Sequence, residues 1–485
     1  MFIRFKDQTE FSSAFSYYDS TFNNTNAGRS SLRNYFQEAS YGALTVSTTF
    51  YPTPGSFVVS YQDTFNRSYY LPIDSAPDGY TGGSNGTERR MREHALLKNA
   101  INAIASSVPS GLDIDADDDG YVDNVCFVIR GTTAAWAMLL WSHRWALYSY
   151  DVSINGKQVW DYNFQMESQF SATVLCHEMG HSVGYPDLYH YYNGTGLSPT
   201  GRWDIMCSSN QYAPPPHTCS YMKSYYTGWL GAIPEITASG TYWLKPLASG
   251  TSGVSYRIAS PNSTSEYYVV EYRRKAGTFE NSVYGSGLLV FRINGDFAGW
   301  GNADYDGTSI FDEVYLYRPG GSPTVNGDLT TAYFSGGSGR TAINDGTDPS
   351  GYLCDGTDGG LDISAVSSAG DSISFYVDMG TGVAGGPAAI APAAALRLLP
   401  PRPNPSSGTV RLGFELGAPG RVRLAVYSVT GQLVATLAEG NVAAGRHEAC
   451  WNGADRSGRT TAAGVYFARL ETAGGTLTQR LTMLR

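Results

Sequence analysis

The chain has 485 residues and a mass of 52.3 kDa, which exceeds one ordinary domain and indicates about two to four. Hydrophobic residues make up 42% of the sequence, and this share excludes a globally disordered chain. The net charge of −10 and the pI of about 5.2 argue against a nucleic-acid-binding protein, because such a protein needs a basic face. Only 16% of residues are charged, whereas there are 56 Gly and 35 Tyr, a composition that indicates a β-rich protein with many loops.

Residues 1–234 mix the periodicities of strands and helices, so we predict an α+β domain there. Buried strands are expected at 2–5 and 125–130, where apolar residues follow one another closely. Apolar side chains recur at helical spacing over 89–106, and a second helix is expected at about 169–183.

The remaining chain is expected to be almost entirely β-structure. Residues 235–380 alternate apolar and polar side chains between Gly, Asn and Asp turns, which predicts a β-sandwich domain with strands at 241–247, 266–273, 286–293 and 372–379. Residues 381–395 have the composition of a linker. Residues 396–485 hold eleven Arg and five acidic residues, and their evenly spaced short strands predict a separate immunoglobulin-like sandwich.

No segment has the length of a membrane span, since the apolar run at 132–141 is only about half as long as one. The N-terminus shows no cleavable apolar leader, so we expect any export leader or pro-segment to be missing from this chain. Six cysteines are too few for a disulfide scaffold. Cys207 and Cys219 stand twelve positions apart, and spacing leaves open whether they pair.

The most informative stretch is CHEMGHSVGYPDLY at 176–189. His177 and His181 are four residues apart, so they share one helix face and can reach one zinc ion, with Glu178 beside them. Gly184 allows the chain to leave the helix and turn back, which makes Asp187 the expected third ligand. Two alternatives stay open: a surface helix with two polar histidines, and a different group as third ligand.

This stretch, followed by GRWDIM at 201–206, resembles the metzincin-type zinc signature of the immune inhibitor A (M6) family of secreted bacterial metallopeptidases. The resemblance extends over residues 1–380, including SLRNYFQEASYGALTVS at 31–47 as an early helix and strand, and WSHRW at 141–145. It implies a catalytic domain with a mixed twisted sheet and an active-site helix. It also implies that Met206 forms a methionine turn below the metal, although an ordinary core methionine would look the same.

The ligands predict the chemistry. Two imidazoles and one carboxylate would leave zinc with an open position, where the pKa of a bound water falls to about 7. Glu178 would take its proton during attack on a peptide carbonyl and pass that proton to the leaving amine. Ser208 stands where some metzincins have a tyrosine, so no tyrosine switch is expected, and Tyr212 and His217 are candidate oxyanion partners.

Two further expectations concern the substrate and a second metal. An extended peptide is expected to pair along an exposed strand near 158–166, or this strand is simply an internal one. The loop DADDDGYVD at 115–123 resembles the first part of an EF-hand loop, although Cys126 replaces the final Glu. It predicts a structural calcium site, with a solvated acidic turn as the alternative; the expected ligands are Asp115, Asp117, Asp119, Tyr121 and Asp123.

Residues 399–485 resemble the FlgD-like or Por-secretion (type IX) C-terminal sandwich of exported bacterial proteins, through PPRPNPSSG, VYSVTGQLV, CWNGADRSGR and AAGVYFARL. The resemblance implies a sorting or anchoring domain that meets the bacterial secretion machinery, and a passive appendage is the alternative. We therefore expect a secreted or cell-surface zinc endopeptidase that acts on proteins or peptides. A catalytically silent surface adhesin on a peptidase fold and a glycan-binding or glycan-cleaving protein are the competing classes.

Overall fold

The computed structural model describes residues 1–83, 86–191, 197–208, 210–303 and 312–380 in its first part. In its C-terminal part it describes 397–398, 401, 406, 408–416, 419–428, 432–443, 445–456, 458–462, 464–472 and 475–483. The chain divides into two compact units, Met1–Gly380 and Thr381–Arg485. The expected linker at 381–395 lies outside the described residues.

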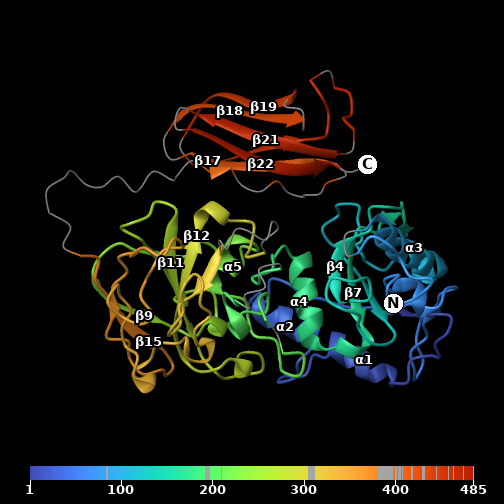
Figure 1. Ribbon diagram of the computed structural model, residues 1–485, viewed down its shortest axis with the longest axis horizontal. Helices are drawn as coiled ribbons and strands as arrows, with labels where there is room; N and C mark the ends of the chain where they lie inside the picture. The colour runs from blue at the N-terminus through green and yellow to red at the C-terminus, as the bar shows by residue number, and fades with distance from the viewer. Residues whose placement is uncertain are drawn as a thin grey trace. The chain divides into compact units, whose positions relative to one another are not determined.

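A five-stranded sheet in the order β2-β1-β3-β7-β4 organises the N-terminal half of the first unit (Figure 1). Its strands are β1 (Phe2–Arg4), β2 (Tyr61–Gln62), β3 (Val125–Ile129), β4 (His143–Ala146) and β7 (Asp161–Met166). Strand β7 pairs in parallel with β3 and antiparallel with β4, so it is hydrogen-bonded on both sides. The predicted exposed edge at 158–166 is therefore wrong, and β4 is the outer strand of the described sheet.

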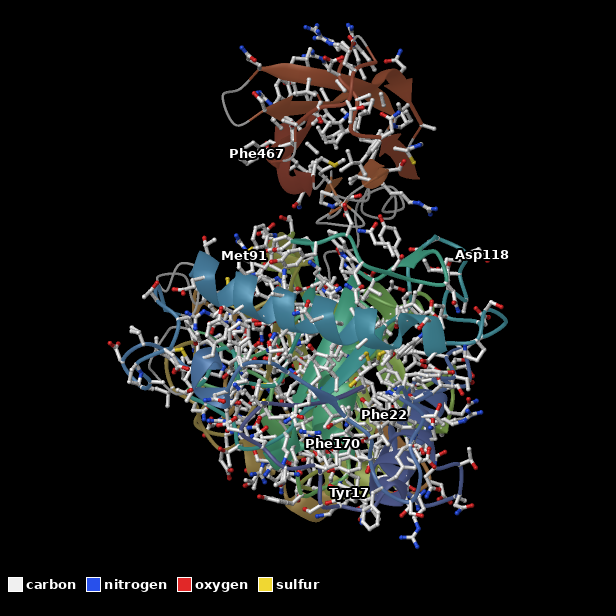
Figure 2. All side chains as sticks on the ribbon, turned by 90° about the vertical axis from the view of Figure 1, so that its right-hand side faces the viewer. Tyr17, Phe22, Met91, Asp118, Phe170 and Phe467 are labelled. Atoms are coloured by element: carbon white, nitrogen blue, oxygen red, sulfur yellow. The ribbon has the colours of Figure 1, made fainter. Side chains whose placement is uncertain are left out.

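Helices cover both faces of this sheet. α3 (Thr87–Ile104) lies across one face, and α1 (Phe15–Asn23), α2 (Leu32–Ala39) and α4 (Ala172–Ser182) pack on the other. Alternation along β3 explains the two cores, since Val128 joins the core that includes α4 whereas Phe127 and Ile129 join the core under α3. Figure 2 shows Tyr17, Phe22 and Phe170 gathered on the α1 side, with the ring of Phe170 5.9 Å from Tyr17 and 5.7 Å from Phe22.

Both helices predicted for this half are confirmed, as α3 and α4. The early helix is present as α2, but the strand expected to follow it is wrong, because residues 43–49 form no strand. Across the described ranges, no helix combines the length and the hydropathy required to cross a bilayer.

The second half of the first unit contains two sheets that enclose a shared core. The larger has the order β13-β12-β11-β10-β8, with β8 (Glu235–Ile236), β10 (Ser255–Ala259), β11 (Glu266–Arg273), β12 (Gly287–Asn294) and β13 (Val314–Leu316). The smaller has the order β14-β15-β9, with β9 (Gly240–Leu244), β14 (Ile363–Ser364) and β15 (Ile373–Val377). Val270 and Val290 face the smaller sheet, whereas Val269 and Leu289 join the core of the N-terminal half. The larger sheet is therefore buried on both faces.

A cluster of buried charges includes residues from both sides of the domain boundary expected at 234/235. That boundary stays a prediction. Arg273 is fully buried and contacts Glu271 at 3.3 Å and Glu280 at 2.6 Å. It also donates to the backbone carbonyls of Trp203 at 2.8 Å and His217 at 3.2 Å. Residues from both sides of the division thus share one set of buried charges.

Short elements complete the first unit. They are α5 (Ser220–Tyr225), a small hairpin of β5 (Ser153–Ile154) and β6 (Lys157–Gln158), and the 3₁₀ turns η1 (Arg67–Tyr70), η2 (Ala105–Ser107), η3 (Glu167–Gln169), η4 (Gly201–Trp203), η5 (Leu247–Ser249), η6 (Glu280–Ser282), η7 (Gly295–Phe297), η8 (Leu329–Thr331) and η9 (Gly336–Ser338).

The second unit is built from two antiparallel sheets, as its strand pattern predicts. One has the order β16-β17-β20, with β16 (Arg397–Leu398), β17 (Val410–Leu416) and β20 (Gly445–Trp451). The other has the order β19-β18-β21-β22, with β18 (Gly420–Ser428), β19 (Leu433–Val442), β21 (Gly464–Thr472) and β22 (Gly475–Met483). Their core includes Trp451, which is 2% exposed and donates from its indole nitrogen to Ala454 O at 2.8 Å.

We predict that Arg273→Ala lowers the free energy of unfolding of the first unit by about 3–5 kcal/mol, because it leaves buried carboxylates without their counter-charge. Arg274→Ala is the matched control, since Arg274 pairs with Asp371 on the surface with 44% of its side chain exposed. Its loss should cost less than about 1 kcal/mol. Urea denaturation of both variants measures the difference, and equal costs would contradict a structural role for the buried cluster.

Candidate metal centre

Helix α4 carries three of the predicted site residues and ends where the sequence requires a turn. Its N-cap, Ser171, accepts a hydrogen bond from Val174 N at 3.2 Å. At the other end Gly184 has a φ of 104°, a left-handed conformation that suits glycine. Tyr185 N donates back to Gly180 O at 2.9 Å, which closes the helix end and turns the chain back toward the helix.

The turn brings Asp187 to the two histidines. Its Oδ1 atom lies 3.2 Å from His177 Nε2 and 3.3 Å from His181 Nε2. The two imidazole rings have centroids 4.9 Å apart. The structure therefore places the three predicted zinc ligands around one point.

Backbone carbonyl groups orient both rings. His177 Nδ1 lies 2.8 Å from Ile205 O, and His181 Nδ1 lies 2.8 Å from Tyr185 O. Because a carbonyl only accepts hydrogen bonds, each Nδ1 must carry the proton. In its neutral form each ring then directs the lone pair of Nε2 toward Asp187, which is the tautomer that metal-binding histidines use.

Three acceptor atoms that face one another at these distances require positive charge between them, as imidazole protons or as a metal cation. Asp187 Oδ1 is buried and has no hydrogen-bond partner. Burial alone would lower the pKa of His177, but the carboxylates of Asp187 and Glu178 outweigh it and raise that pKa to about 9. Burial opposes ionisation of Asp187, but His181 and His177 lower its pKa far below the usual range. Two nitrogens and one carboxylate oxygen are a ligand set that suits zinc.

Glu178 belongs to the same cluster. It is only 6% exposed, and its carboxylate lies with the ligand atoms of His177 and His181 inside a group whose atoms are all within 4.8 Å of one another. Its position beside the imidazoles, on the same helix, allows it to exchange a proton with a molecule bound between them.

Aromatic side chains surround Asp187 on its other side. The hydroxyl group of Tyr191 donates to Asp187 Oδ2. The ring of Tyr189 lies nearly parallel to that of His177, with centroids 6.3 Å apart. Sequence reasoning missed the contact of Tyr191, because residues 185–191 form no helix and their spacing does not predict which side chains meet.

Met206 lies directly below the helix. A Cβ atom added at Gly180 would stand 2.7 Å from Met206 Sδ, so the glycine allows this close approach. Met206 O accepts a hydrogen bond from Leu188 N at 2.8 Å, and Met206 N donates to Asp204 Oδ1 at 2.9 Å. The segment that holds Met206 thus contacts both the helix and the bend that follows it.

The candidate oxyanion partners do not lie together in an open site. Tyr212 is 89% exposed at the surface, whereas His217 is fully buried. His217 Nδ1 lies 3.1 Å from Lys223 Nζ and its Nε2 lies 3.2 Å from Glu38. Burial, with the charge of Lys223 next, lowers the pKa of His217 well below the usual value. His217 is therefore a buried structural residue.

The two cysteines whose pairing the sequence left open are not bonded to each other. Cys207 and Cys219 are both free and buried, and Cys207 Sγ lies 3.3 Å from Ser198 Oγ.

The acidic loop at 115–123 brings only part of its predicted ligand set together. Carboxylate oxygens of Asp115, Asp117 and Asp123 lie within 4.8 Å of one another. Asp119 Oδ1 instead accepts a hydrogen bond from Tyr121 N at 2.8 Å within the loop. Lys157 Nζ lies 2.6 Å from Asp115 Oδ2, so an internal cation already neutralises part of the acidic charge.

The loop has the backbone shape of a tight turn. Asp118 and Gly120 have φ angles of 58° and 91°, and Figure 2 shows Asp118 at the outer end of the loop. Asp115 accepts hydrogen bonds from Asp119 N at 2.9 Å and Gly120 N at 3.0 Å. Asp115 therefore organises the turn, whatever cation the loop binds.

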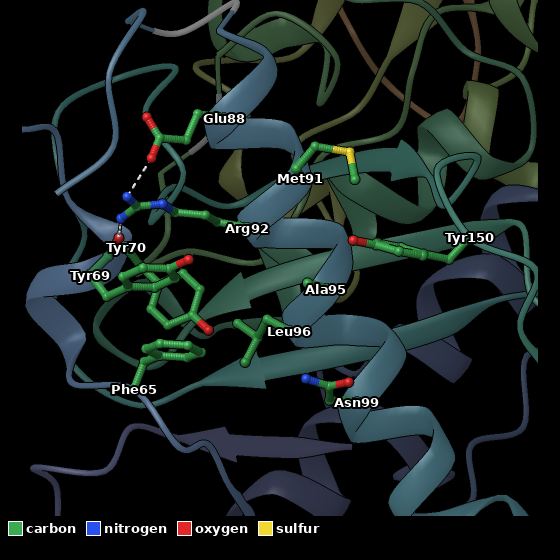
Figure 3. Close-up of a pocket in the computed structure, with 10 residues that line it drawn as sticks. All are labelled: Phe65, Tyr69, Tyr70, Glu88, Met91, Arg92, Ala95, Leu96, Asn99 and Tyr150. Carbon is green, nitrogen blue, oxygen red and sulfur yellow. Dashed lines mark hydrogen bonds and ion pairs between the residues drawn. The ribbon is translucent and has the colours of Figure 1, made fainter. Parts of the chain in front are cut away.

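A separate hollow of about 260 Å³ lies against α3 and contains none of the predicted site residues (Figure 3). Aromatic rings line it, with Phe65 and Tyr69 stacked at 4.1 Å. Its basic side chain, Arg92, donates to the carbonyl oxygens of Asp78 at 2.8 Å and Gly79 at 3.3 Å and also pairs with Glu88. Because Arg92 is bound to the protein itself, the hollow offers little polar anchoring for a ligand.

Comparison with known proteins places this geometry in context. Residues 116–231 match the family model of the immune inhibitor A peptidase M6 catalytic domain, and residues 404–475 match that of the FlgD Ig-like domain. The pre-pro-metalloprotease PrtV of Vibrio cholerae is 28% identical over 212 residues, which cover 37% of this chain and 21% of PrtV. Immune inhibitor A of Bacillus thuringiensis subsp. alesti is 27% identical over 212 residues, which cover 36% of this chain and 28% of that protein.

Among solved structures, FlgD from P. aeruginosa is 29% identical over 16% of this chain and 59% of its own, with a TM-score of 0.13. The matched residues cover 21% of PrtV and 28% of immune inhibitor A, so this chain spans well under half the length of either relative. The predicted resemblance is confirmed for the two parts that the family models match: this chain carries an immune inhibitor A (M6) peptidase catalytic domain that includes residues 116–231 and a FlgD Ig-like domain that includes residues 404–475.

Proposed function

We propose that the chain is a zinc-dependent endopeptidase that hydrolyses protein or peptide substrates. The observation that carries this proposal is that Asp187 Oδ1 lies 3.2 Å from His177 Nε2 and 3.3 Å from His181 Nε2, with Glu178 beside the histidines. The match to the M6 catalytic domain, which covers all four residues, supports it independently.

Zinc, when bound, would polarise the substrate carbonyl and lower the pKa of the attacking water. The chain supplies the remaining chemistry. Glu178 accepts the proton of that water as it attacks the carbonyl, and then donates the proton to the leaving amine. The Nδ1 protons of His177 and His181 are committed to carbonyl groups at 2.8 Å, so Nε2 is the atom of each ring that can bind zinc in place of a proton.

The peptide substrate is proposed to lie along β4 instead of the strand first expected. β4 pairs with β7 on one side, through Arg144 opposite Asn163, and is the outer strand of the described sheet. An outer strand offers backbone donors and acceptors that can pair with an extended peptide of almost any sequence.

A catalytically silent surface adhesin is the alternative for this chain. Such a protein would have no need for an acid beside the paired histidines, yet Glu178 is present and buried with them. The glycan-directed alternative has less support, because Arg92, the basic group of the aromatic hollow, is bound to other parts of the protein.

The C-terminal unit is proposed to direct export by a type IX secretion machinery, which would make the protein secreted or attached to the cell surface. The support is the match of residues 404–475 to the FlgD Ig-like domain and the antiparallel two-sheet architecture. A shared architecture alone does not determine function, so this role depends on the resemblance.

We further propose a structural calcium site at the acidic loop. Asp115, Asp117 and Asp123 bring three carboxylates within 4.8 Å, and hard oxygen ligands of this kind suit calcium. Burial raises the pKa of Asp123, and the carboxylate of Asp117 adds to this against the opposing hydrogen bond from Ala116 N, as expected of an acid that lacks enough positive charge around it. Lys157 supplies only part of that charge.

Glu178→Gln should keep the fold and the bound zinc but lower kcat by roughly 10²- to 10⁴-fold, because the amide cannot accept a proton. Casein hydrolysis, zinc content and thermal stability are measured on the same preparation. Glu235→Gln, a change at a residue exposed on β8, is the control and should leave all three unchanged. Full activity of a zinc-loaded Glu178→Gln protein would refute the assignment.

Gly180→Ala should weaken zinc binding, since the new methyl group would meet Met206 Sδ at 2.7 Å and displace either the helix or the methionine. The double variant Gly180→Ala/Met206→Ala removes the methionine side chain from the path of the new methyl group, so it should regain a large part of the zinc affinity. Chelator competition measures the three affinities. A double variant that binds zinc no better than Gly180→Ala would show that the methionine contact does not support the ligands.

Calcium should raise the melting temperature of the zinc-loaded protein, and Asp117→Asn should abolish the increase by removing one of three converging carboxylates. Asp371→Asn is the control, because Asp371 is a surface acid whose side chain is 98% exposed in a pair with Arg274. Differential scanning calorimetry with and without calcium provides the comparison. The same melting temperature in both conditions would leave the loop as a solvated acidic turn held by Lys157.

A further inference from the structure

The bend that carries Asp187 is held from outside the N-terminal half. Asn302, which follows β12 in the chain, donates from its backbone nitrogen to Asp187 O at 2.9 Å. Its side-chain Nδ2 donates to the next backbone carbonyl along the chain, Leu188 O, at 3.3 Å. A residue more than a hundred positions away thus binds the backbone at and just after the predicted third ligand.

Asn302 is itself fixed in place. It is 3% exposed, and its side chain makes a reciprocal pair with Val314 of β13. Nδ2 donates to Val314 O at 2.7 Å, and Oδ1 accepts from Val314 N at 3.0 Å. The position of its backbone nitrogen is therefore set by a strand of the larger sheet in the second half of the unit.

A buried carboxylate anchors the residues before Asn302. Glu313 is fully buried and accepts hydrogen bonds from Gly299 N at 3.0 Å and Gly301 N at 2.6 Å. It also accepts from the hydroxyl groups of Tyr221 and Tyr226, each at 2.6 Å. Four donors from two separate segments thus converge on one side chain and fix the loop relative to α5.

Gly301 allows the close approach of this loop to the bend. Its φ is 67°, and an added Cβ atom would stand 2.4 Å from Asp187 O and 2.6 Å from Pro186 Cβ. Only glycine can adopt this conformation and leave that space free. The loop and the bend are therefore in direct backbone contact, without intervening side chains.

We propose that residues 299–302, anchored by Glu313, are a positioning element of the metal centre. They hold the backbone of Asp187 so that Oδ1 stays directed at the two histidines. The second half of the first unit then has a role in metal binding in addition to its own packing. This inference rests on the proposed zinc site. Partners that orient metal ligands typically contribute about 10- to 100-fold in metal affinity, which sets the size of the expected effect.

The test compares two glycine variants of the full chain. Gly301→Ala places a methyl group against the ligand bend, whereas Gly253→Ala introduces the same left-handed strain, at a φ of 68°, with no atom within 4 Å of the new carbon. Zinc affinity is measured by chelator competition on metal-free protein, and the melting temperature of that protein reports the general cost. We expect Gly301→Ala to bind zinc roughly 10- to 100-fold more weakly, and Gly253→Ala to bind it as the parent does.

Asn302→Ala is the second variant, in case Gly301→Ala does not fold. It removes the side-chain bonds to Leu188 and Val314, and Asn262→Ala is its match, since Asn262 Nδ2 donates to Asp358 O at 2.8 Å in a turn that does not touch the bend. Zinc affinity equal to that of the parent in the folded variants, or an equal loss in variant and control, would overturn the inference and leave the proposed enzyme intact. A parent protein that fails to bind zinc would instead overturn the proposed function, and this inference with it.

Discussion

The account depends on three acceptor atoms that the fold directs at one another. Asp187 Oδ1, which lies 3.2 and 3.3 Å from the two imidazole nitrogens, repels their lone pairs unless positive charge lies among the three atoms. The fold keeps them there with backbone groups: the carbonyl groups of Ile205 and Tyr185 fix the rings. Without a metal, protons on the imidazoles can supply that charge, as the raised pKa of His177 indicates, and a metal cation would take their place on binding. This geometry supports the proposal that the site binds a cation, and its nitrogen and oxygen ligands favour zinc.

The same unit contains a second set of buried charges with a different role. Arg273 and its carboxylate partners are fully buried, and each carboxylate has a counter-charge within the protein. The metal centre differs because the oxygen of Asp187 that faces the histidines has no hydrogen-bond partner. The charges of Arg273 and its partners join the two halves of the first unit, whereas the Asp187 oxygen faces two histidines at a point where a bound cation would supply positive charge.

Local sequence was sufficient to predict the elements and site residues that lie close together in the chain. His177, His181, the glycine turn and Asp187 fall within the eleven residues 177–187, so spacing alone brings the side chains to one point. The strands at 266–273 and 286–293 were equally clear, because their apolar runs lie between turn residues. Periodicity could not show that β7 is covered by β4, since pairing depends on a segment from elsewhere in the chain. The contact between Asn302 and Asp187 could not be predicted from the sequence for the same reason.

Anomalous scattering at the zinc absorption edge, from crystals grown with zinc, tests the central claim most directly. The account predicts one strong peak between the two imidazoles and the Asp187 carboxylate, at about 2.0–2.2 Å from each ligand atom. A fully loaded crystal with no peak at that point, or with zinc bound only elsewhere, would contradict the account.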